Sequence, residues 1–231
     1  MQKLTVIIPV YNESKTILKI IDKVLKVNIN KQIIVVDDCS DDDSLNKILS
    51  ISNKIDKILI HKENQGKGFA IKTAQKYIDG THVIIQDADL EYDPKDYKEL
   101  MKPFFDQNIS VVYGSRVLNK ERYSSQNFSS IDRVFYNHVL TTLSNLINSQ
   151  NLTDAHTCYK VFRSDLFKSI ELKEKGFAFC PEITTKISKL KKKIIEVPIN
   201  YTGRNYDEGK KIKFKDGIEA IIALFKYKYF K

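Results

Sequence analysis

The sequence predicts an α/β fold in which a mostly parallel β-sheet is flanked by helices. Apolar, β-branched runs alternate with segments of helical period, which is the pattern of βαβ units. The runs at 4–10 and 32–37 are almost continuously apolar, as expected for strands that are buried on both faces of a parallel sheet. A chain of 231 residues is long enough to bury one sizeable core, so we expect residues 1–231 to form a single domain.

The predicted elements follow one another in a regular order. We expect strands at 4–10, 32–37, 56–61, 81–86 and 109–114. Helices are expected between and after them, at 13–26, 42–50, 66–78 and 94–107. Residues 115–130 have no clear period and predict a loop near the functional site. The remaining elements are a helix at 131–147, a strand at 158–163, a helix at 181–190 and a strand at 193–201.

Acidic residues follow two of the predicted strands. Residues 83–94 read Val-Ile-Ile-Gln-Asp-Ala-Asp-Leu-Glu-Tyr-Asp-Pro, so Asp87, Asp89 and Glu91 come where a strand ends, and Asp38 follows another strand. In open parallel sheets, ligands bind outside the carboxyl ends of the strands. Carboxylates without neighbouring cysteine or histidine suit Mg²⁺ or Mn²⁺, although an Asp-x-Asp sequence also occurs in loops and helix caps.

Two further segments place polar groups at this edge. Tyr11, Asn12 and Glu13 follow the first predicted strand. Residues 64–68, Asn-Gln-Gly-Lys-Gly, precede a predicted helix and could offer backbone N–H groups and a lysine to a phosphate. This segment lacks the spacing and the Lys-Ser/Thr pair of a Walker loop.

Charge and composition restrict the partners. The net charge is +9, with 38 Lys and Arg against 29 Asp and Glu, which indicates an anionic partner or a lysine-rich, solvated surface. The acidic cluster argues against nucleic acid, because it would repel a phosphate backbone. Three widely separated cysteines, Cys39, Cys158 and Cys180, are expected to be free thiols.

The C-terminal segment at about 213–231 is basic and amphipathic. Its lysines alternate with isoleucine, phenylalanine and tyrosine, so it suits either an anionic membrane surface or packing on the domain. No apolar run is long enough to span a bilayer, and the start lacks a signal sequence. We therefore expect a cytoplasmic protein, peripheral on the cytoplasmic face of the membrane, without a transmembrane segment. The helix at 131–147 could border a lipid entrance or pack in the core.

These motifs together resemble the family-2 glycosyltransferases, which have the GT-A (Rossmann-like) fold. The matching segments are Val-Ile-Ile-Pro-Val-Tyr-Asn-Glu at 6–13, Val-Val-Asp-Asp at 35–38, Asn-Gln-Gly-Lys-Gly at 64–68 and Asp-Ala-Asp at 87–89. Later segments match as well: Gly-Ser-Arg at 114–116, Thr-Asp-Ala-His-Thr-Cys-Tyr-Lys at 153–160, and Arg204 followed by Glu-Gly-Lys-Lys at 208–211. Within the family, the chain is most similar to enzymes that load a sugar onto dolichol or undecaprenyl phosphate.

The resemblance implies an inverting, metal-dependent enzyme that moves a sugar from a UDP- or GDP-sugar to a polyprenyl phosphate. Asp89 and Glu91 match the ligands of a Mg²⁺ or Mn²⁺ ion, and many relatives have glutamine in place of Glu91. Asp87 is expected near the ribose, the sugar or the metal. The family positions around the nucleotide are Pro9, Tyr11, Asn12, Glu13, Asp38, Gly66 and Lys67.

A phosphate acceptor already carries a nucleophilic oxyanion, so it needs cations rather than a general base. The resemblance assigns the acceptor phosphate and the leaving diphosphate to Arg116, Arg133, Arg204, Lys210 and Lys211. Arginine suits this role because its planar fork binds phosphate oxygens in pairs. Asp154 matches an acidic position beside the donor sugar or the acceptor.

Three other functions fit parts of the pattern. A saccharide hydroxyl could be the acceptor, with Asp154 or Glu182 as the base, or the chain could be a non-catalytic module that binds nucleotide sugars. A nucleotidyltransferase would share the sheet and the metal. It would normally carry a glycine-rich basic loop after the first strand, where this chain has Tyr-Asn-Glu.

Overall fold

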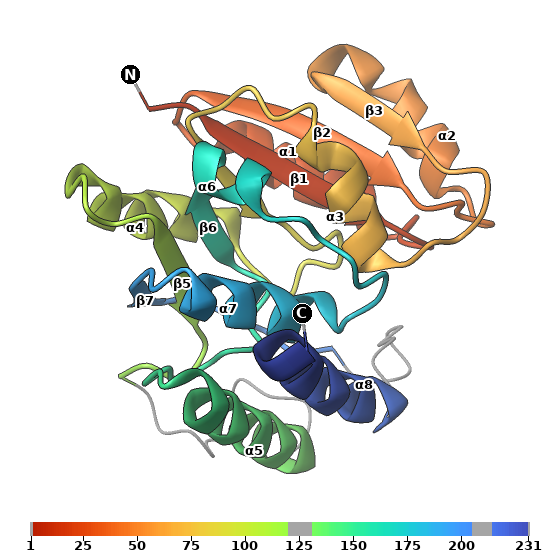
Figure 1. The fold of residues 1–231 in the computed structure, drawn as a ribbon. Helices are drawn as coiled ribbons and strands as arrows, with labels where there is room; N and C mark the ends of the chain where they lie inside the picture. Colours follow the sequence, from red (N-terminus) through yellow and green to blue (C-terminus); the bar gives the residue numbers. More distant parts are fainter. Residues whose placement is uncertain (1, 120–130, 205–213, 231) are drawn as a thin grey trace.

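The computed structural model describes residues 2–119, 131–204 and 214–230. Within them, seven strands form one sheet in the order β3-β2-β1-β4-β6-β5-β7 (Figure 1). The strands are β1 (Leu4–Val10), β2 (Lys31–Asp37), β3 (Lys57–Ile60), β4 (His82–Ile85), β5 (Val111–Ser115), β6 (Lys160–Arg163) and β7 (Ile194–Pro198). Only the pairs that include β6 are antiparallel among these strands. The predicted α/β fold with a mostly parallel sheet is confirmed.

The register brings the carboxyl ends of the central strands together. β1 pairs with β2 from Leu4 opposite Lys31 to Val10 opposite Asp37, and with β4 as far as Ile7 opposite Ile85. The middle of β1 is fully buried, which explains its continuous apolar run. The polar residues that follow β1, β2 and β4 therefore meet at one edge of the sheet, as the sequence predicts.

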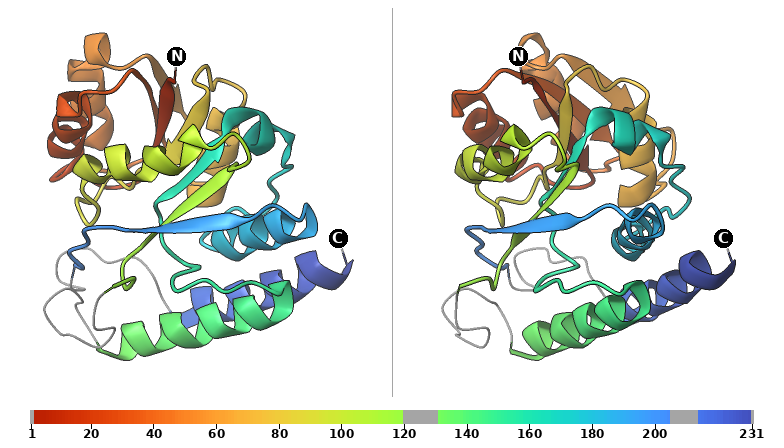
Figure 2. Two further views of the ribbon diagram at one scale, coloured as in Figure 1. Left: turned by 90° about the vertical axis from the view of Figure 1, so that its left-hand side faces the viewer. Right: turned by 60° about the vertical axis from the view of Figure 1, so that its left-hand side comes forward.

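Helices cover both faces of the sheet. They are α1 (Ile17–Lys26), α2 (Ser44–Ser50), α3 (Lys67–Gln75), α4 (Tyr97–Met101), α5 (Ile131–Asn148), α6 (Ser164–Ser169), α7 (Phe179–Lys189) and α8 (Phe214–Phe225). Three short 3₁₀ turns are η1 (Ser52–Lys54), η2 (Pro94–Asp96) and η3 (Lys102–Phe105), and a π-helical turn, η5 (Lys226–Phe230), ends the described chain. α1 and α4 lie on one face, and α3, α6 and α7 lie on the other (Figure 2).

Several element boundaries differ from the prediction. The helix expected at 94–107 is divided into η2, α4 and η3, and η3 contains Pro103, which has no N–H for a helical hydrogen bond. The first helix begins at Ile17 rather than at residue 13, because the backbone of the preceding Thr16 has a φ of −121°, outside the helical range. The short helix α6 was not predicted. The loop expected at 115–130 is described only as far as residue 119.

The C-terminal segment packs on the body of the protein. The ring of Tyr227 is fully buried, and its hydroxyl donates to Glu174 over 2.7 Å. α8 contacts α5 and α7, and the three helices lie together at the end of the molecule opposite β3 (Figure 1). Packing is therefore one role of this segment, while its outer face stays exposed. No helix in the described ranges is long and apolar enough to cross a membrane.

Candidate active site

Side chains from three distant segments meet at the carboxyl edge of the sheet. Glu13 follows β1, Asp89 follows β4, and Arg204 lies beyond β7. The Arg204 guanidinium donates from Nη2 to Asp89 over 2.9 Å and from Nη1 and Nη2 to the two Glu13 oxygens over 3.2 Å each. Arg204 therefore neutralises two of the carboxylates that the sequence assigns to the nucleotide and the metal.

The Glu91 carboxylate is directed toward residues 201–204. Its Oε1 accepts from the Arg204 backbone N–H and its Oε2 from the Tyr201 hydroxyl, each over 2.9 Å. The Thr202 N–H donates to the Glu91 carbonyl oxygen, also over 2.9 Å. In this structure Glu91 thus holds the segment that carries Arg204, and its assignment as a metal ligand stays a prediction.

Asp89 lies in strongly negative surroundings. Burial and the charges of Asp87 and Glu91 together raise its pKa to about 7, although Arg204 opposes this shift. Within the described part of the chain, no three Asp, Glu, His or Cys side chains are arranged as a ready metal cluster. The donor set nevertheless fits a hard divalent ion, because Asp87 and Asp89 supply carboxylate oxygens where a positive charge is favoured.

Asp87 pairs with Lys67, the first residue of α3. The Lys67 Nζ lies 2.5 Å from Asp87 Oδ1 and 3.4 Å from the Cys158 sulfur. The sequence assigns Lys67 to the diphosphate, and the structure places its ammonium at the acidic edge. Its charge there is balanced by Asp87.

Asp38 shapes the glycine-containing loop at 64–68. Its carboxylate accepts from the backbone N–H groups of Gln65 over 2.9 Å and Gly66 over 2.6 Å, and it lies 2.6 Å from His61 Nδ1. Gly66 has a φ of 88°, and a Cβ there would lie 2.6 Å from the Lys175 carbonyl oxygen. Glycine is therefore needed at position 66 for its backbone conformation and for close packing against Lys175.

Of the residues around the end of β1, Pro9 and Asn12 take part in the protein's own contacts, whereas Tyr11 is exposed. Pro9 pairs with Val36 inside the sheet, and it is only partly exposed. Asn12 has a φ of 51°, and its side-chain oxygen accepts from the Asp41 N–H over 3.0 Å. Tyr11 is 36% exposed beside them. Of these residues, Tyr11 is the one whose ring can lie against a nucleoside base.

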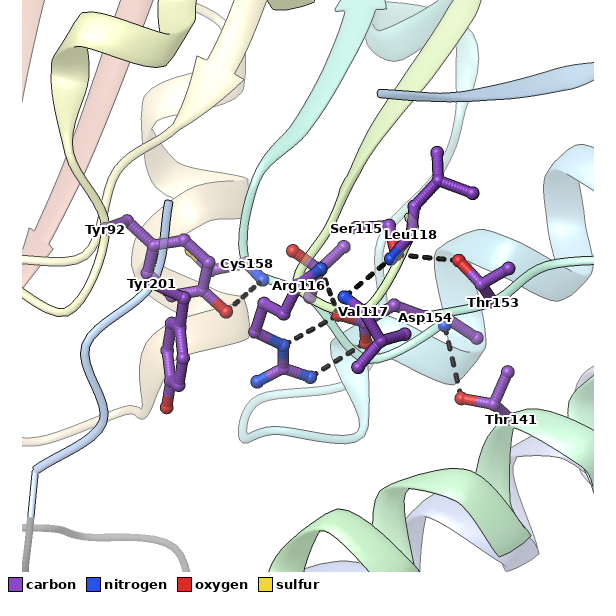
Figure 3. Close-up of polar contacts among 12 residues, drawn as sticks. Tyr92, Ser115, Arg116, Val117, Leu118, Thr141, Thr153, Asp154, Cys158 and Tyr201 are labelled. Carbon is purple, nitrogen blue, oxygen red and sulfur yellow. Dashed lines mark hydrogen bonds and ion pairs between the residues drawn. The ribbon is translucent and has the colours of Figure 1, made fainter. Parts of the chain in front are cut away.

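Arg116 and Asp154 form a buried, bidentate ion pair (Figure 3). Arg116 Nε and Nη2 donate to Asp154 over 2.7 and 2.8 Å, and the Arg116 backbone N–H donates over 3.1 Å. The Tyr201 ring centre lies 5.1 Å from the guanidinium carbon. The pair lines a small cavity together with Val134, Asn137 and Thr141. The resemblance assigns Arg116 to a phosphate. In the structure its guanidinium is instead paired with the Asp154 carboxylate.

Residues 5–171 match the sequence profile of Glycosyl transferase family 2. The chain belongs to this family. Two dolichyl-phosphate beta-glucosyltransferases of Trichomonas vaginalis are similar to it over nearly its whole length. One is 28% identical over 98% of this chain and 73% of its own length, and the other is 25% identical over 97% and 72%. The predicted family is confirmed, and the protein is a glycosyltransferase.

A solved structure supports the GT-A fold of this glycosyltransferase. Glucosyl-3-phosphoglycerate synthase from Mycobacterium tuberculosis, in complex with Mn²⁺, UDP and phosphoglyceric acid, superposes with a TM-score of 0.75. The match covers 100% of this chain and 80% of the synthase, with 18% sequence identity. At this identity the similarity establishes the fold alone.

Both carboxylates that could act as a base for a hydroxyl acceptor are engaged in this glycosyltransferase. Although burial alone would raise the pKa of Asp154, Arg116 and its hydrogen bonds bring that pKa below the ordinary value. Glu182 is fully buried, and it accepts from the Lys173 and Glu174 N–H groups over 2.8 and 2.9 Å. Its Oε1 also pairs with Lys186 over 2.6 Å.

Three predicted cations are not placed by the structure. Arg133 belongs to the first turn of α5, but its side chain lies outside the described residues, and so do Lys210 and Lys211. Their assignment to the phosphates stays a prediction.

Sequence reasoning missed His61, Tyr201 and Glu196. The two Glu196 oxygens accept from the Thr153 and Asp154 N–H groups over 2.7 and 2.9 Å, which fixes the loop that carries Asp154. These contacts join residues 42 or 43 positions apart, and no local spacing reveals them. Tyr201 alone carried a signal, since it is an aromatic residue just before Arg204.

Proposed function

We propose that this glycosyltransferase moves glucose, with inversion, from UDP-glucose to a polyprenyl phosphate. The observation that carries the proposal is the convergence of Glu13, Asp87, Asp89 and Arg204 at one edge of the sheet. Carboxylates and an arginine in one place suit a site that must hold both a cation and phosphate groups. The likeness to dolichyl-phosphate beta-glucosyltransferases supports the lipid acceptor and the sugar. The UDP and Mn²⁺ of the synthase support the donor.

The state of the candidate bases favours a phosphate acceptor over a hydroxyl. Asp154 is paired with Arg116, and Glu182 is paired with Lys186 and two backbone N–H groups. A phosphate monoester needs neither of them, because its oxyanion attacks without losing a proton. One phosphate oxygen forms a bond to the anomeric carbon while the bond to the diphosphate oxygen breaks and UDP departs. Attack from the opposite face inverts the configuration.

The chain's own residues would divide the remaining work. Asp89 and Asp87 would hold a Mg²⁺ or Mn²⁺ ion, which when bound stabilises the charge of the leaving diphosphate. Tyr11 would lie against the base, and the loop at 64–68, held by Asp38, would border the nucleotide. Arg204 would meet the acceptor phosphate. A lipid acceptor implies that the protein works as a peripheral protein at the cytoplasmic face of a membrane.

The test is a transfer assay with radiolabelled UDP-glucose, Mn²⁺ and a short, water-soluble prenyl phosphate such as geranyl phosphate. We expect a product that extracts into organic solvent and releases glucose in mild acid. Asp89→Asn should lower kcat/KM at least about a hundredfold, because a metal ligand is lost. Asp79→Asn is the control, since Asp79 is an exposed carboxylate whose partner is Lys3, away from this edge.

Other results would decide against the proposal. Transfer to a saccharide hydroxyl but not to prenyl phosphate would indicate the alternative acceptor. Donor binding without hydrolysis or transfer would indicate a non-catalytic module. Transfer to prenyl phosphate from GDP-sugars alone would support the proposed acceptor and show that the proposed UDP donor is wrong.

A further inference from the structure

Helices α5 and α8 form a layer at the end of the molecule opposite β3 (Figure 2). They contact each other, and both contact α7, so α7 separates much of this layer from the sheet. We call the outward sides of these two helices the α5–α8 face. It carries several exposed apolar side chains, which raises the question of what covers them.

The part of α5 whose side chains the structure describes is free of full charges. No Asp, Glu, Lys or Arg occurs between Val134 and Asn148. Phe135, Val139 and Leu146 are exposed and lie four and then seven residues apart, a spacing that puts them on one side of a helix. Leu146 is 79% exposed. A surface helix normally directs charged residues outward, so this stripe predicts a non-aqueous partner.

The α8 part repeats the same spacing. Ile218, Ile222, Phe225 and Tyr229 are exposed at intervals of four, three and four residues. Its opposite side is apolar as well, with Ala223 and Leu224 buried against the protein. α8 thus already has one apolar side covered by the protein, and it presents a second one outward.

Lysines border the face at the C-terminal end of α8. The Lys189 Nζ donates to the Tyr227 carbonyl oxygen over 3.2 Å, which brings the end of α7 against η5. Lys191, Lys192 and Lys193 follow and are exposed. Further charged residues of this border and of α8 are Lys215, Asp216, Glu219, Lys226 and Lys228. Lys226 is paired with Glu174 over 2.6 Å and Lys215 lies 3.5 Å from Glu219, so the excess of positive charge comes from Lys228 and from the exposed lysines that follow α7.

We propose that the α5–α8 face docks on an anionic lipid bilayer. Phenylalanine, isoleucine and leucine enter the boundary between head groups and acyl chains, while the lysines meet the negative head groups. The mixture of apolar stripes and a basic border suits this partner better than a second copy of the chain, whose own border would repel it. The inference rests on the proposed function in one respect, since a lipid acceptor would be found on that surface.

The test measures co-flotation of the full-length protein with vesicles of phosphatidylcholine, with and without phosphatidylglycerol. We expect binding that requires the anionic lipid and weakens with salt. A Leu146→Glu and Ile222→Glu double variant should partition at least about tenfold less into the vesicles, because two carboxylates would enter the apolar boundary. Phe105→Glu is the matched control, since Phe105 is 77% exposed on η3, outside the α5–α8 face.

Two outcomes would overturn the docking proposal. Equal binding by the double variant and the wild type would show that another surface binds lipid. Absence of vesicle binding, with a dimer that Leu146→Glu dissociates in size-exclusion chromatography, would make the face an interface between copies. Transfer to geranyl phosphate separates the two proposals, because it needs no vesicle. A wild type that binds vesicles without transferring glucose to geranyl phosphate would refute the proposed reaction and leave the docking face standing.

Discussion

Arg204 serves as the resident counter-ion of the acidic edge. Its guanidinium contacts Asp89 and Glu13, and its Nε lies 3.7 Å from Glu91. A divalent ion held by Asp89 would place a second positive charge beside the guanidinium, so we expect the ion and Arg204 to compete for this carboxylate. An ion that displaces Arg204 would release the guanidinium toward the acceptor phosphate, which would link donor binding to assembly of the acceptor site.

Replacing Arg204 should therefore strengthen metal binding. In Arg204→Gln the positive charge beside Asp89 is lost, and we expect the Kd for Mn²⁺ without nucleotide to fall by about tenfold. Binding is measured by electron paramagnetic resonance of free Mn²⁺, a readout independent of catalysis. Lys215→Gln removes the same charge from an exposed site on α8 and should leave the Kd unchanged. Weaker or unchanged Mn²⁺ binding in Arg204→Gln would show that the arginine does not compete with the ion.

At the scale of elements, the sequence predicted the strands and the fold class, which depend on local patterns of residue type. The apolar run of β1 and the β-branched run of β4 predicted parallel strands, and their order placed Glu13 and Asp89 at one edge. The fold class followed from this alternation, because strand burial leaves a direct trace in residue type. Helix boundaries were harder to predict, since they depend on prolines such as Pro103 and on single backbone angles such as the φ of −121° at Thr16.

The partners of the charged residues could not be predicted in the same way. Arg116 and Asp154 are 38 residues apart, and their bidentate contact depends on how the loop after β5 lies over residues 153–155. An arginine that pairs with a carboxylate cannot be told from sequence alone from one that binds a phosphate, because the same planar guanidinium binds both groups. Residue type therefore predicted the region of the site but not which charges neutralise one another.

The first residue of β4 makes stability depend on pH. His82 is 1% exposed and packs against the Phe104 ring. Burial and the nearby charge of Arg163 together lower its pKa to about 4, against an opposing effect of Asp165. The unfolded chain has the ordinary histidine pKa of about 6.5, so it binds more protons than the folded chain between these values. Acid therefore favours unfolding over this range.

We expect His82 to destabilise the fold by about 2 kcal/mol when the pH falls from 7.5 to 5. His82→Gln stays neutral over this range and should lose less stability than the wild type by about that amount. Urea unfolding at the two pH values measures the difference. An equal loss in both proteins would show that His82 is protonated without cost in the folded state.

At the scale of the whole molecule, residues 173–176 connect the C-terminal layer to the nucleotide loop. Glu174 accepts from Lys226 and Tyr227 over 2.6 and 2.7 Å. The next residue, Lys175, donates from Nζ to the Gln65 side chain over 2.9 Å, and its carbonyl oxygen accepts from the Phe69 N–H over 3.1 Å. We propose that residues 1–231 form one domain. In that domain, the proposed docking face would support the donor site through this segment.

Weakening the contact between Glu174 and Lys226 should therefore loosen the loop at 64–69, which contacts the other side of segment 173–176. In Glu174→Gln the ion pair with Lys226 is lost, and charged hydrogen bonds of this kind contribute about 1.5–3 kcal/mol. We expect backbone hydrogen exchange to accelerate by about tenfold or more at 173–176 and, to a smaller degree, at 64–69, where Asp38 holds the Gln65 and Gly66 N–H groups. Mass spectrometry of peptides covering both segments measures the change.

The neighbouring Glu171 provides the control for this coupling. Its side chain is 73% exposed and pairs with Lys173 over 3.1 Å, so Glu171→Gln removes an equal charge from the same region without touching η5. Exchange at 64–69 should then match the wild type, because an exposed ion pair contributes little. Faster exchange confined to 173–176 in Glu174→Gln would show that the effect stops at this connecting segment. In that case the donor loop would keep its contacts with Asp38 and Lys175 without help from Glu174, and membrane docking through α8 would leave nucleotide binding unaffected.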